Sequence, residues 1–500
     1  MTAGDGLDPR LPVLVGVGQL NVRVDRGEAP LEPVAMLAEA ARIAADDATV
    51  DVGVERLLAG VDTIGVIDIL SFRYPDPAAL VAGLVGAEPR RRWRTTPGGN
   101  YPQTLVSRAA ADIAAGDADL VLIGGAEAWR TRSAARAAGT DLGWTHQPDD
   151  AAPTERFGSA DSLSAEDEIA RGLFMPVQLY PIFESAVRAA AGRTQAEHRA
   201  FLGELWARFS AVAASNPHAW IREARTAEEI ATPGPSNRMI GHPYPKLMNS
   251  NNSVEQAAAL VLCSVGTASD LGIPTDRWVF PWSAAGAADA YPTNRWAFDE
   301  SPAMRLSARR ALDLAALGVD DCALVDLYSC FPSAVQVAQR ELGVAVDRPF
   351  TITGGLTFAA GPLNCYCLLA LVRAVGLLRD APEQRALLTG NGGYFTKHSM
   401  LVLGGSPPNG FQVGSAQAAV DALPTRPDPV GPAARARLEA YTVTFDRERR
   451  PERAILACLD ADGCRHWAES YDAELVTALL DADLCGSTVE IDATATAVRR

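Results

Sequence analysis

Two kinds of hydrophobic pattern alternate along this chain. Short, nearly continuous apolar runs are separated by longer segments in which apolar residues recur every three to four positions. The short runs indicate strands, and their lack of polar positions is typical of sheets covered on both faces. The alternation predicts an α/β fold. The predicted strands are Pro12–Gln19, Val61–Ile69, Ala118–Ile123, Ala257–Ser264, Ala323–Tyr328, Ala386–Thr389 and Ser399–Leu403, and the predicted helices are Val34–Ala48, Pro102–Ala115, Ser301–Leu317, Pro332–Leu342 and Leu363–Leu378.

A loop, a helix of small residues and a glycine-ended strand occur once in each half of the chain. Gly98–Pro102 precedes an alanine-rich helix, and Leu120–Gly125 then ends in paired glycines. Ala359–Pro362 and Ala386–Gly393 repeat that order later. The repeat is weak in sequence identity, but it predicts a duplicated βαβ fold in which loops from both halves meet at one shared site.

A long excursion separates the two halves. Residues 129–245 contain two helical stretches, Val177–Ala191 and Gln195–Ser215, and little strand pattern. Insertions of this size on an α/β core are usually lids or substrate-shaping domains. We therefore expect a first half over residues 1–270, which includes the excursion, and a second half over residues 271–414.

The C-terminal region has a different pattern. Four prolines from Pro424 to Pro432 stiffen the region of a predicted linker over residues 415–431. Beyond it, Asp460–Gly463 is a hairpin signal between two apolar runs. Several half-buried strands with one intervening helix predict a small β barrel of OB type over residues 432–500. The strand signals lie at residues 441–445, 454–459, 464–468 and 489–495.

Composition and charge narrow the class of protein. The 500 residues carry a formal net charge of -16 and are 48% apolar, as in a globular protein of several folded units. Nucleic acids and anionic membrane surfaces attract cationic proteins, so the charge argues against both as main partners. A basic cluster at Arg90–Arg94 is interpreted as a solvated strand face. The sequence has neither a signal-peptide pattern at its start nor an apolar run long enough to predict a membrane span.

Metal and dinucleotide sites are not predicted. Eight cysteines are few for this length, and none forms a CxxC pair. Cys365 and Cys367 lie closest together, but their spacing matches no common zinc motif. The acidic run Glu166–Glu168 is interpreted as a solvated helix N-terminus, and no GxGxxG motif connects a strand to a helix. We expect reduced thiols and a cytoplasmic location.

Four loops resemble those of the thiolase superfamily, in the order of the family. Val325–Phe331 resembles the Asn-Glu-Ala-Phe loop, and is closer to the His-Asp-Cys-Phe version of the sterol-carrier-protein-2 thiolases. Gly354–Leu363 resembles the segment that contains Gly-His-Pro. Gly98–Gly116 resembles the loop and helix of the nucleophilic cysteine, and Thr389–Gly393 resembles the loop of the second cysteine.

The resemblance covers residues 12 to 405. Arg238–Tyr244 and Asn249–Ala258 also resemble the end of the thiolase lid and the return to the core. With an OB-like end added, the chain resembles the actinobacterial thiolase-like proteins of type 1. The resemblance implies a duplicated thiolase fold with α/β/α/β/α layers, a helical loop-domain excursion and a small C-terminal β domain.

The same resemblance implies a degenerate active site. Thiolases need a cysteine that takes the acyl group, a base, and donors for the oxyanions that form. By position, the nucleophile falls on Gly99, the histidine of Gly-His-Pro on Gly361 and the second cysteine on Gly390. Glycine can neither attack nor carry a proton, so we expect no ordinary ping-pong thiolysis and a roomier site. The Asn of Asn-Glu-Ala-Phe falls on Tyr328, while Gly392 keeps the backbone N–H of the second oxyanion hole.

The sequence supports two roles for Tyr328 equally. Its hydroxyl either donates to an oxyanion or moves a proton, or its ring fills the space of lost side chains. Cys330 and Cys365 are interpreted as small buried thiols. Asn100, Tyr101, His242, Asn391 and His398 each have a structural or turn role as the alternative to ligand contact. The residues predicted to carry any catalysis are Tyr328, Asn391, Gly392 and His398, and those predicted to line a coenzyme A pocket are Gly99, Asn100, Tyr101, His242, Gly361 and Gly390.

Three functions remain open from the sequence. The first is an acyl-CoA-handling protein related to acetyl-CoA acetyltransferases, with altered or weak activity. The second is a retro-aldol carbon–carbon lyase on a β-hydroxyacyl-CoA that uses Tyr328. The third is a non-catalytic acyl-CoA binding or scaffold protein. Coenzyme A or an acyl-CoA is the expected ligand, and no covalently bound cofactor is implied.

The sequence allows a monomer or a homodimer. Thiolases usually dimerise through the strand that leads into the nucleophile loop, which here lies near Arg90–Thr96. A two-fold pairing would bring its arginines close to their copies, which is unfavourable. This pattern favours the monomer.

Overall fold

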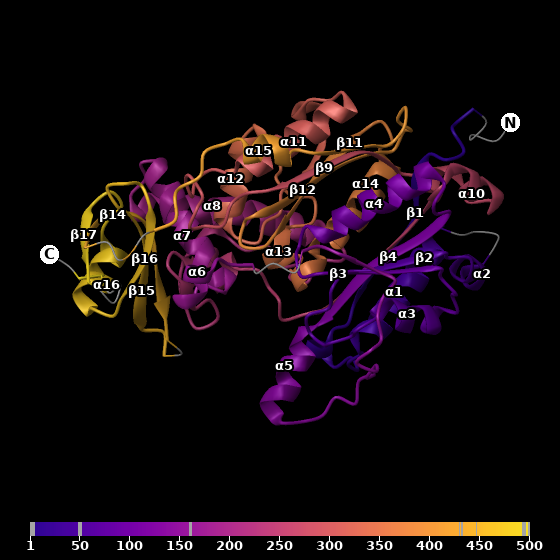
Figure 1. Cartoon of the computed structure of the whole chain (residues 1–500). Helices are drawn as coiled ribbons and strands as arrows, with labels where there is room; N and C mark the ends of the chain where they lie inside the picture. Colours follow the sequence, from indigo (N-terminus) through magenta and orange to yellow (C-terminus); the bar gives the residue numbers. More distant parts are fainter. Residues whose placement is uncertain are drawn as a thin grey trace.

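Two sheets form the centre of the protein (Figure 1). The structure is a computed structural model that describes residues 6–48, 53–159, 163–429, 431, 434–446, 448–492 and 497–498. The first sheet has the order β1-β8-β4-β2-β3-β5, and its strands are β1 Pro12–Asn21, β2 Thr63–Val66, β3 Arg91–Thr95, β4 Leu120–Ala128, β5 Glu155–Phe157 and β8 Glu255–Ser264. The second has the order β10-β11-β12-β9-β13, and its strands are β9 Phe280–Ala288, β10 Leu324–Asp326, β11 Arg385–Gly392, β12 Lys397–Gly404 and β13 Gln412–Ser415.

Helices lie between and outside these sheets and create five layers. Alternate residues of β4 show the arrangement, because Leu122 joins one buried cluster and Ile123 joins the other. Helices α4 and α14 pack between the two sheets, α1 and α3 cover the outer face of the first, and α11 and α12 cover the outer face of the second. The helix bounds are α1 Pro33–Ala48, α3 Pro77–Val85, α4 Tyr101–Ala115, α11 Pro302–Ala315, α12 Pro332–Leu342 and α14 Tyr366–Asp380. The predicted duplicated α/β architecture is confirmed.

The predicted strands and helices of the core are present, with shifts of a few residues at their ends. The helix predicted from Leu363 begins at Tyr366, after a 3-10 turn over Leu363–Cys365. Strand β9 was not predicted, because its sequence Phe-Pro-Trp-Ser-Ala-Ala-Gly-Ala-Ala has little of the β-branched character that marks a strand. Its backbone pairs with β12 and β13, so the sheet itself imposes the extended conformation.

The basic cluster at Arg90–Arg94 is a correction to the sequence interpretation. Strand β3 does form there, but its arginines are half-buried and paired rather than solvated. Arg92 contacts Asp76 at 2.8 Å and Arg94 contacts Asp68 at 2.6 Å. On the other side, the backbone of β3 pairs with β5, which comes from the excursion and forms the edge strand of the first sheet.

The excursion is mainly helical, as predicted. It begins with α5, which projects away from the first sheet (Figure 1), and it ends in two short strands that leave the central layers. Its elements are α5 Trp129–Ala138, α6 Glu166–Ala170, α7 Pro176–Ala190, α8 Gln195–Ser215, α9 Ala227–Ala231, β6 Met239–Gly241 and β7 Tyr244–Pro245. Among the described residues, no helix is both long and apolar enough to cross a bilayer.

The C-terminal region forms a third sheet of antiparallel strands at one end of the molecule (Figure 1). The predicted hairpin is confirmed, with Leu459 paired to Arg465. The outer strands β16 and β18 approach each other without a ladder between them in the described part of the chain, so the barrel is not closed there. Ala493 and Ala495, which continued the predicted alternation, lie outside the described residues. The elements are β14 Arg435–Phe445, β15 Pro451–Leu459, β16 Arg465–Ser470, α16 Ala473–Asp481, β17 Thr488–Ile491 and β18 Ala497–Val498.

This sheet has a core of its own and also docks tightly on the excursion. Residues of β14, β15, α16 and β17 form a separate buried cluster. However, β14 also pairs with β6 at Thr444 and Gly241, and the Tyr441 N–H donates to Ser185 of α7 at 2.8 Å. The fully buried Arg465 donates to backbone carbonyls of the second half and pairs with Glu439. The C-terminal sheet is therefore joined to the rest of the chain by backbone pairing, buried charge and shared core.

Candidate functional site

A cavity of about 330 Å³ lies where loops of the two halves meet beneath the excursion. Its floor comes from the loop before α4, the loop after β10, the segment before α14 and the end of β11. Residues 174–180 at the start of α7 form its roof. The floor and side residues include Gly98, Gly99, Tyr328, Cys330, Phe331, Leu356, Gly361, Asn364, Asn391 and Gly392. The duplicated loops thus converge at one site, as their order in the sequence predicts.

Gly99 and Tyr328 pack against each other in the cavity wall. A Cβ atom built on Gly99 would lie 2.9 Å from Cζ of Tyr328 and 2.6 Å from the carbonyl oxygen of Asn391, and it would also overlap the Tyr328 hydroxyl. Contacts this close do not occur for real Cβ atoms, because the repulsion is too strong. The Tyr328 hydroxyl therefore fills the position that a side chain at residue 99 would take.

The spaces at Gly361 and Gly390 are filled as well. A Cβ on Gly361 would meet the side chain of Leu356 at 3.1 Å. A Cβ on Gly390 would lie 3.1 Å from Oε1 of Gln103 and would overlap the Ser399 hydroxyl. The expectation of a roomier site is thus wrong at these positions, because neighbouring side chains occupy the volume that three glycines leave.

The Tyr328 hydroxyl is an available hydrogen-bond donor. Its backbone N–H donates to the Thr389 hydroxyl at 2.8 Å, and its ring meets Tyr366 edge-on at 5.4 Å. Among the described residues its own hydroxyl has no hydrogen-bond partner. Burial, followed by the neighbouring Cys330 thiol, raises the pKa of Tyr328 well above its usual value. The phenol therefore stays neutral at physiological pH and can donate but not accept a proton.

A buried polar cluster beneath the cavity fixes the ring that supports Tyr328. Tyr366 donates to Asp326 at 2.9 Å and shares a 2.6 Å hydrogen bond with Thr353. Asp326 also accepts from the Thr351 hydroxyl and the Ile352 N–H. Burial raises the pKa of Asp326 to about 6 despite these donors. The cluster holds Tyr366 in one orientation, so the edge that packs on Tyr328 is fixed.

Asn391 lines the cavity and connects it to the excursion. Its Nδ2 donates to the Tyr180 hydroxyl at 2.9 Å and lies 3.8 Å from the Cys330 sulfur, while its Oδ1 is buried and has no partner among the described residues. Tyr180 stacks on Phe331 at 4.5 Å. Burial raises the pKa of Tyr180 well above its usual value and that of Cys330 to about 12. Sequence reasoning missed Tyr180, because nothing in the excursion pattern shows which helix covers the loops.

Asn100, Tyr101 and Gly390 lie behind the cavity wall rather than on it. The Asn100 carbonyl accepts from the Ser399 hydroxyl at 3.1 Å, and its Oδ1 stands where a Cβ on Gly392 would be. The Tyr101 hydroxyl forms a 3.1 Å hydrogen bond with Thr96. These residues shape the loop that presents Gly99. Asn364, which was not predicted, accepts from the Gly98 N–H and donates to the Asp68 carbonyl, both at 3.0 Å, so it ties the two halves together.

The two candidate histidines lie away from the cavity. His242 stacks on Tyr441 under the C-terminal sheet, where burial lowers its pKa to about 4. His398 is buried and reaches the Ser301 hydroxyl at 3.1 Å and Asp289 at 3.5 Å. Burial would raise the pKa of Asp289, but Arg295 and His398 outweigh it and hold that pKa at about 2. Both histidines join elements of the fold.

A basic groove of about 860 Å³ opens beside the cavity and shares with it the residues Trp129, Val177, Asn249, Ser250 and Asn252. Six cationic residues line the groove against two acidic ones, Asp25 and Glu223. Asp25 pairs with Arg23 of the groove and Glu223 pairs with Arg225 outside it, so most of the positive charge of the groove is uncompensated. The cationic residues are Arg23, Arg26, Arg130, Arg222, Arg238 and Lys246. A chain with a net charge of -16 thus concentrates positive charge at the entrance to its central cavity.

Comparison with solved structures identifies the family. The fold superposes with a TM-score of 0.84 on the monomeric SCP2-thiolase like protein type 1 (STLP1) from Mycobacterium smegmatis, with 32% identity over 99% of this chain and 100% of that one. The chain belongs to the SCP2-thiolase-like proteins of type 1. Residues 415–496 also match the model of the additional C-terminal domain of thiolase-like protein type 1. No curated relative matches the sequence.

More distant neighbours of this type 1 thiolase-like protein share its fold. The Ltp2-ChsH2(DUF35) aldolase has 21% identity and a TM-score of 0.59, over 79% of this chain and 98% of that one. The acetyl-CoA acetyltransferase of Syntrophomonas wolfei has 15% identity and a TM-score of 0.55, over 79% of this chain and 99% of that one. At these identities the likeness shows the thiolase fold alone.

The cavity of this type 1 thiolase-like protein is lined entirely by neutral groups. No carboxylate, imidazole, ammonium or guanidinium is found among the described residues that line it. Its hydroxyls and thiols with raised pKa values, at Tyr180, Tyr328 and Cys330, remain protonated at neutral pH. Across the described part of the chain, no group of three His, Cys, Asp or Glu side chains is placed to hold a metal ion. The arrangement can hold a polar group by hydrogen bonds, but it offers no strong proton acceptor.

Proposed function

We propose that this type 1 thiolase-like protein binds acyl-CoA thioesters between its two halves without forming an acyl-enzyme. The contact between Tyr328 and Gly99 carries the proposal. A thiolase attacks a thioester carbonyl from the position that corresponds to Gly99, and here a neutral phenol fills that position. The thioester then meets a donor in place of a nucleophile.

The other groups that line the cavity support the binding of a thioester beside Tyr328. The free Tyr328 hydroxyl can donate to the thioester carbonyl, while Gly392 lines the same wall as a proposed second donor through its backbone. Apolar side chains of Val177, Phe331 and Leu356 surround the position of the acyl group. Hydrogen-bond donors inside an apolar cavity are worth more than in water, because no solvent competes with them.

The basic groove supports coenzyme A as the rest of the ligand. Coenzyme A carries phosphates at one end and a narrow pantetheine arm at the other. The groove offers six cationic side chains, and it opens into the cavity past Val177 and Asn249. Arginine and lysine bind phosphates by charge and by directed hydrogen bonds. All eight cysteines are free thiols, which fits the proposed cytoplasmic location.

A retro-aldol lyase is the second candidate, because the unpartnered Tyr328 hydroxyl could protonate the carbon released by the cleavage. That reaction also needs a base that removes the proton of the β-hydroxyl as the carbon–carbon bond breaks. The described lining supplies none, since its tyrosines and cysteine are protonated at neutral pH. We therefore propose binding without cleavage ahead of the lyase.

Calorimetry with coenzyme A, acetyl-CoA and a β-hydroxyacyl-CoA tests the proposal, followed by intact mass and product analysis. We expect saturable binding, unmodified protein and no cleavage. Tyr328→Phe should weaken acyl-CoA binding about fivefold through one lost hydrogen bond and leave free coenzyme A unaffected. Tyr441→Phe, which removes a buried hydroxyl of the C-terminal sheet, is the control and should change neither.

Each other outcome has a definite meaning. No binding at millimolar ligand would overturn the proposal. A stable acyl adduct on Cys330 or Cys365 would restore acyl transfer as the function. Cleavage of the β-hydroxyacyl-CoA that disappears in Tyr328→Phe would establish the lyase instead.

A further inference from the structure

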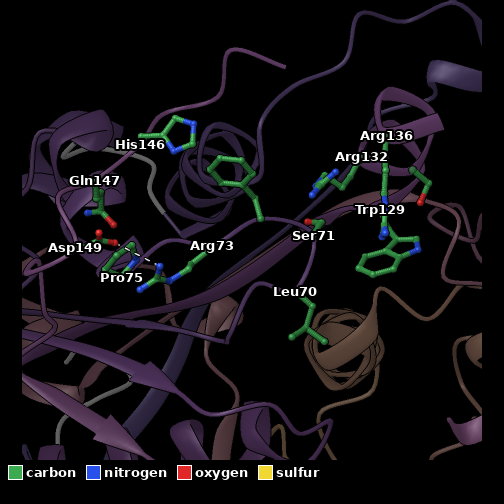
Figure 2. Close-up of a pocket in the computed structure, with 12 residues that line it drawn as sticks. Leu70, Ser71, Arg73, Pro75, Trp129, Arg132, Arg136, His146, Gln147 and Asp149 are labelled. Carbon is green, nitrogen blue, oxygen red and sulfur yellow. Dashed lines mark hydrogen bonds and ion pairs between the residues drawn. The ribbon is translucent and has the colours of Figure 1, made fainter. Parts of the chain in front are cut away.

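A second basic hollow, of about 510 Å³, lies beside α5 (Figure 2) and shares Trp129 and Ser133 with the groove. Its lining combines cationic and aromatic side chains with two serines. The loop after β2 supplies Leu70, Ser71, Phe72, Arg73 and Pro75, helix α5 supplies Trp129, Arg132, Ser133 and Arg136, and the following loop supplies His146, Gln147 and Asp149. The proposed binding of coenzyme A uses none of the arginines that line this hollow.

Helix α5 directs its cations to two different sides. Trp129, Arg132 and Arg136 are spaced at i, i+3 and i+7, which places them on one face of a helix, and all three line the second hollow. Arg130 lines the groove for coenzyme A. The helix contains no acidic residue, so neither set of cations is neutralised from within it.

Two arginines of the hollow have no ionic partner among the residues that the structure describes. Arg73 contacts Asp149 at 3.4 Å, and both side chains are largely exposed, at 77% and 91%, so this pair contributes little. Arg132 and Arg136 have no ion pair among the described residues. Figure 2 shows both arginines among the residues that line the hollow, together with Ser71 and Trp129. Such a cluster suits a carboxylate, which accepts from guanidinium and hydroxyl groups together.

The hollow adjoins the central cavity at two shared side chains. Leu70 and Trp129 line both, and they are 41% and 37% exposed although both are large and apolar. The loop that carries Leu70 is held firmly, because the Leu70 and Ser71 N–H groups donate to the buried Glu127 at 2.7 and 2.8 Å. An acyl chain that leaves the cavity over these two side chains arrives at Arg132.

We propose that the acyl group bound by this protein ends in a carboxylate that the Arg132 and Arg136 face of α5 recognises. This inference rests on the proposed binding of acyl-CoA. The thioester lies at Tyr328, the chain crosses the apolar edge formed by Leu70 and Trp129, and the acid reaches the arginines. Trp129 and Arg136 are seven positions apart on the helix, a rise of about 10 Å, so the ligand is a long ω-carboxyacyl thioester rather than an acetyl group.

Matched pairs of thioesters test this proposal by calorimetry. The mono-CoA thioesters of α,ω-dicarboxylic acids of about six to twelve carbons, a range that covers the rise along α5, are compared with the monocarboxylic acyl-CoA of equal length. We expect the longer dicarboxylic thioesters to bind about tenfold tighter than their partners. Arg132→Gln with Arg136→Gln should remove this preference and leave free coenzyme A unchanged.

Arg130→Gln is the matched control on the same helix. It should weaken coenzyme A and all thioesters alike and keep the preference for the carboxylate. If the dicarboxylic and monocarboxylic thioesters of each pair bind equally while coenzyme A still binds, this inference is overturned. The proposed function is then unaffected. Loss of free coenzyme A binding in the Arg132 and Arg136 variant would assign the hollow to the nucleotide and would also overturn it.

Discussion

The hydroxyl group of Tyr328 stands where a side chain on Gly99 would have to be, although the two residues come from opposite halves of the chain. The glycine and the tyrosine depend on each other, because a side chain at residue 99 leaves no room for the phenol. Restoring a cysteine at residue 99 alone would therefore not recreate a thiolase nucleophile. This dependence can be measured.

Gly99→Ala should destabilise the fold by roughly 1 to 3 kcal/mol, the usual cost of overpacking a well-packed interior. Its Cβ would press on Tyr328 and on the Asn391 backbone. In Tyr328→Ala, part of this cost should disappear, so chemical denaturation of both single variants and the double variant should reveal coupling. Purely additive effects would contradict the contact. Gly83→Ala, a helical glycine with open space around it, is the control and should be neutral or slightly stabilising.

Arg465→Met should loosen the C-terminal sheet. The Arg465 guanidinium is fully buried, donates to the carbonyls of Pro292, Thr293 and Arg295, and pairs with Glu439. Removing it leaves Glu439 with only a longer contact to Arg426 at 3.7 Å, and losing one partner of a buried pair costs about 3 to 5 kcal/mol. Hydrogen exchange should speed up in β14 and β16. Arg450→Met, in the same region but 72% exposed, should change stability by less than about 0.5 kcal/mol.

Glu127→Gln should make stability less dependent on pH. Burial raises the pKa of Glu127 to about 8 even though Ser71 and two backbone N–H groups lower it. Because the pKa in the folded state exceeds that of the unfolded chain, the stability due to this proton is complete below about pH 4.5. It is lost progressively as the pH rises to about 8, by roughly 3 to 5 kcal/mol in total.

Thermal unfolding from pH 5 to pH 9, a range that spans the titration of Glu127, tests whether stability falls as the pH rises. The wild-type protein should lose stability relative to Glu127→Gln as the pH increases. A constant difference between the two proteins would mean that Glu127 is ionised throughout. Glu383→Gln, on an exposed turn, controls for the loss of one negative charge.

We expect a monomer in solution. Strand β3 is the one through which thiolases usually dimerise, and here β5 pairs with its outer edge while Arg92 and Arg94 pair within the chain. A paired edge cannot accept a strand of a second copy. Light scattering coupled to gel filtration should give the mass of one chain at micromolar concentration. A stable dimer would show that another surface associates.

We propose that the chain divides into residues 1–270, 271–414 and 432–500, with a linker over residues 415–431. The linker should be cut first in limited proteolysis, because residues 421–425 are exposed. Since β14 pairs with β6 and packs on α7, the two fragments should nevertheless elute together in gel filtration. Separation of the fragments would show that the third sheet folds and docks independently.

Local sequence determined much of the fold. Helical periodicity located α7 and α8 in the excursion, and apolar runs located the central strands of both sheets, because burial on one or two faces imposes a regular pattern. Strand β9 was not predicted, because its extended conformation depends on pairing with β12 and β13 and not on its own residues. The hairpin of β15 and β16 was predicted from the sequence, because a tight turn needs particular residues.

The candidate site was only partly accessible to sequence. The order of the four loops indicated that Gly99, Gly361, Tyr328 and Asn391 would share a cavity, because the chain order of a duplicated fold fixes which loops meet. The filling of the cavity, the covering Tyr180 and the basic groove and hollow beside α5 were decided only by tertiary structure. Side-chain volumes from distant segments compete for the same space there, and no local pattern in the chain records which of them occupies it.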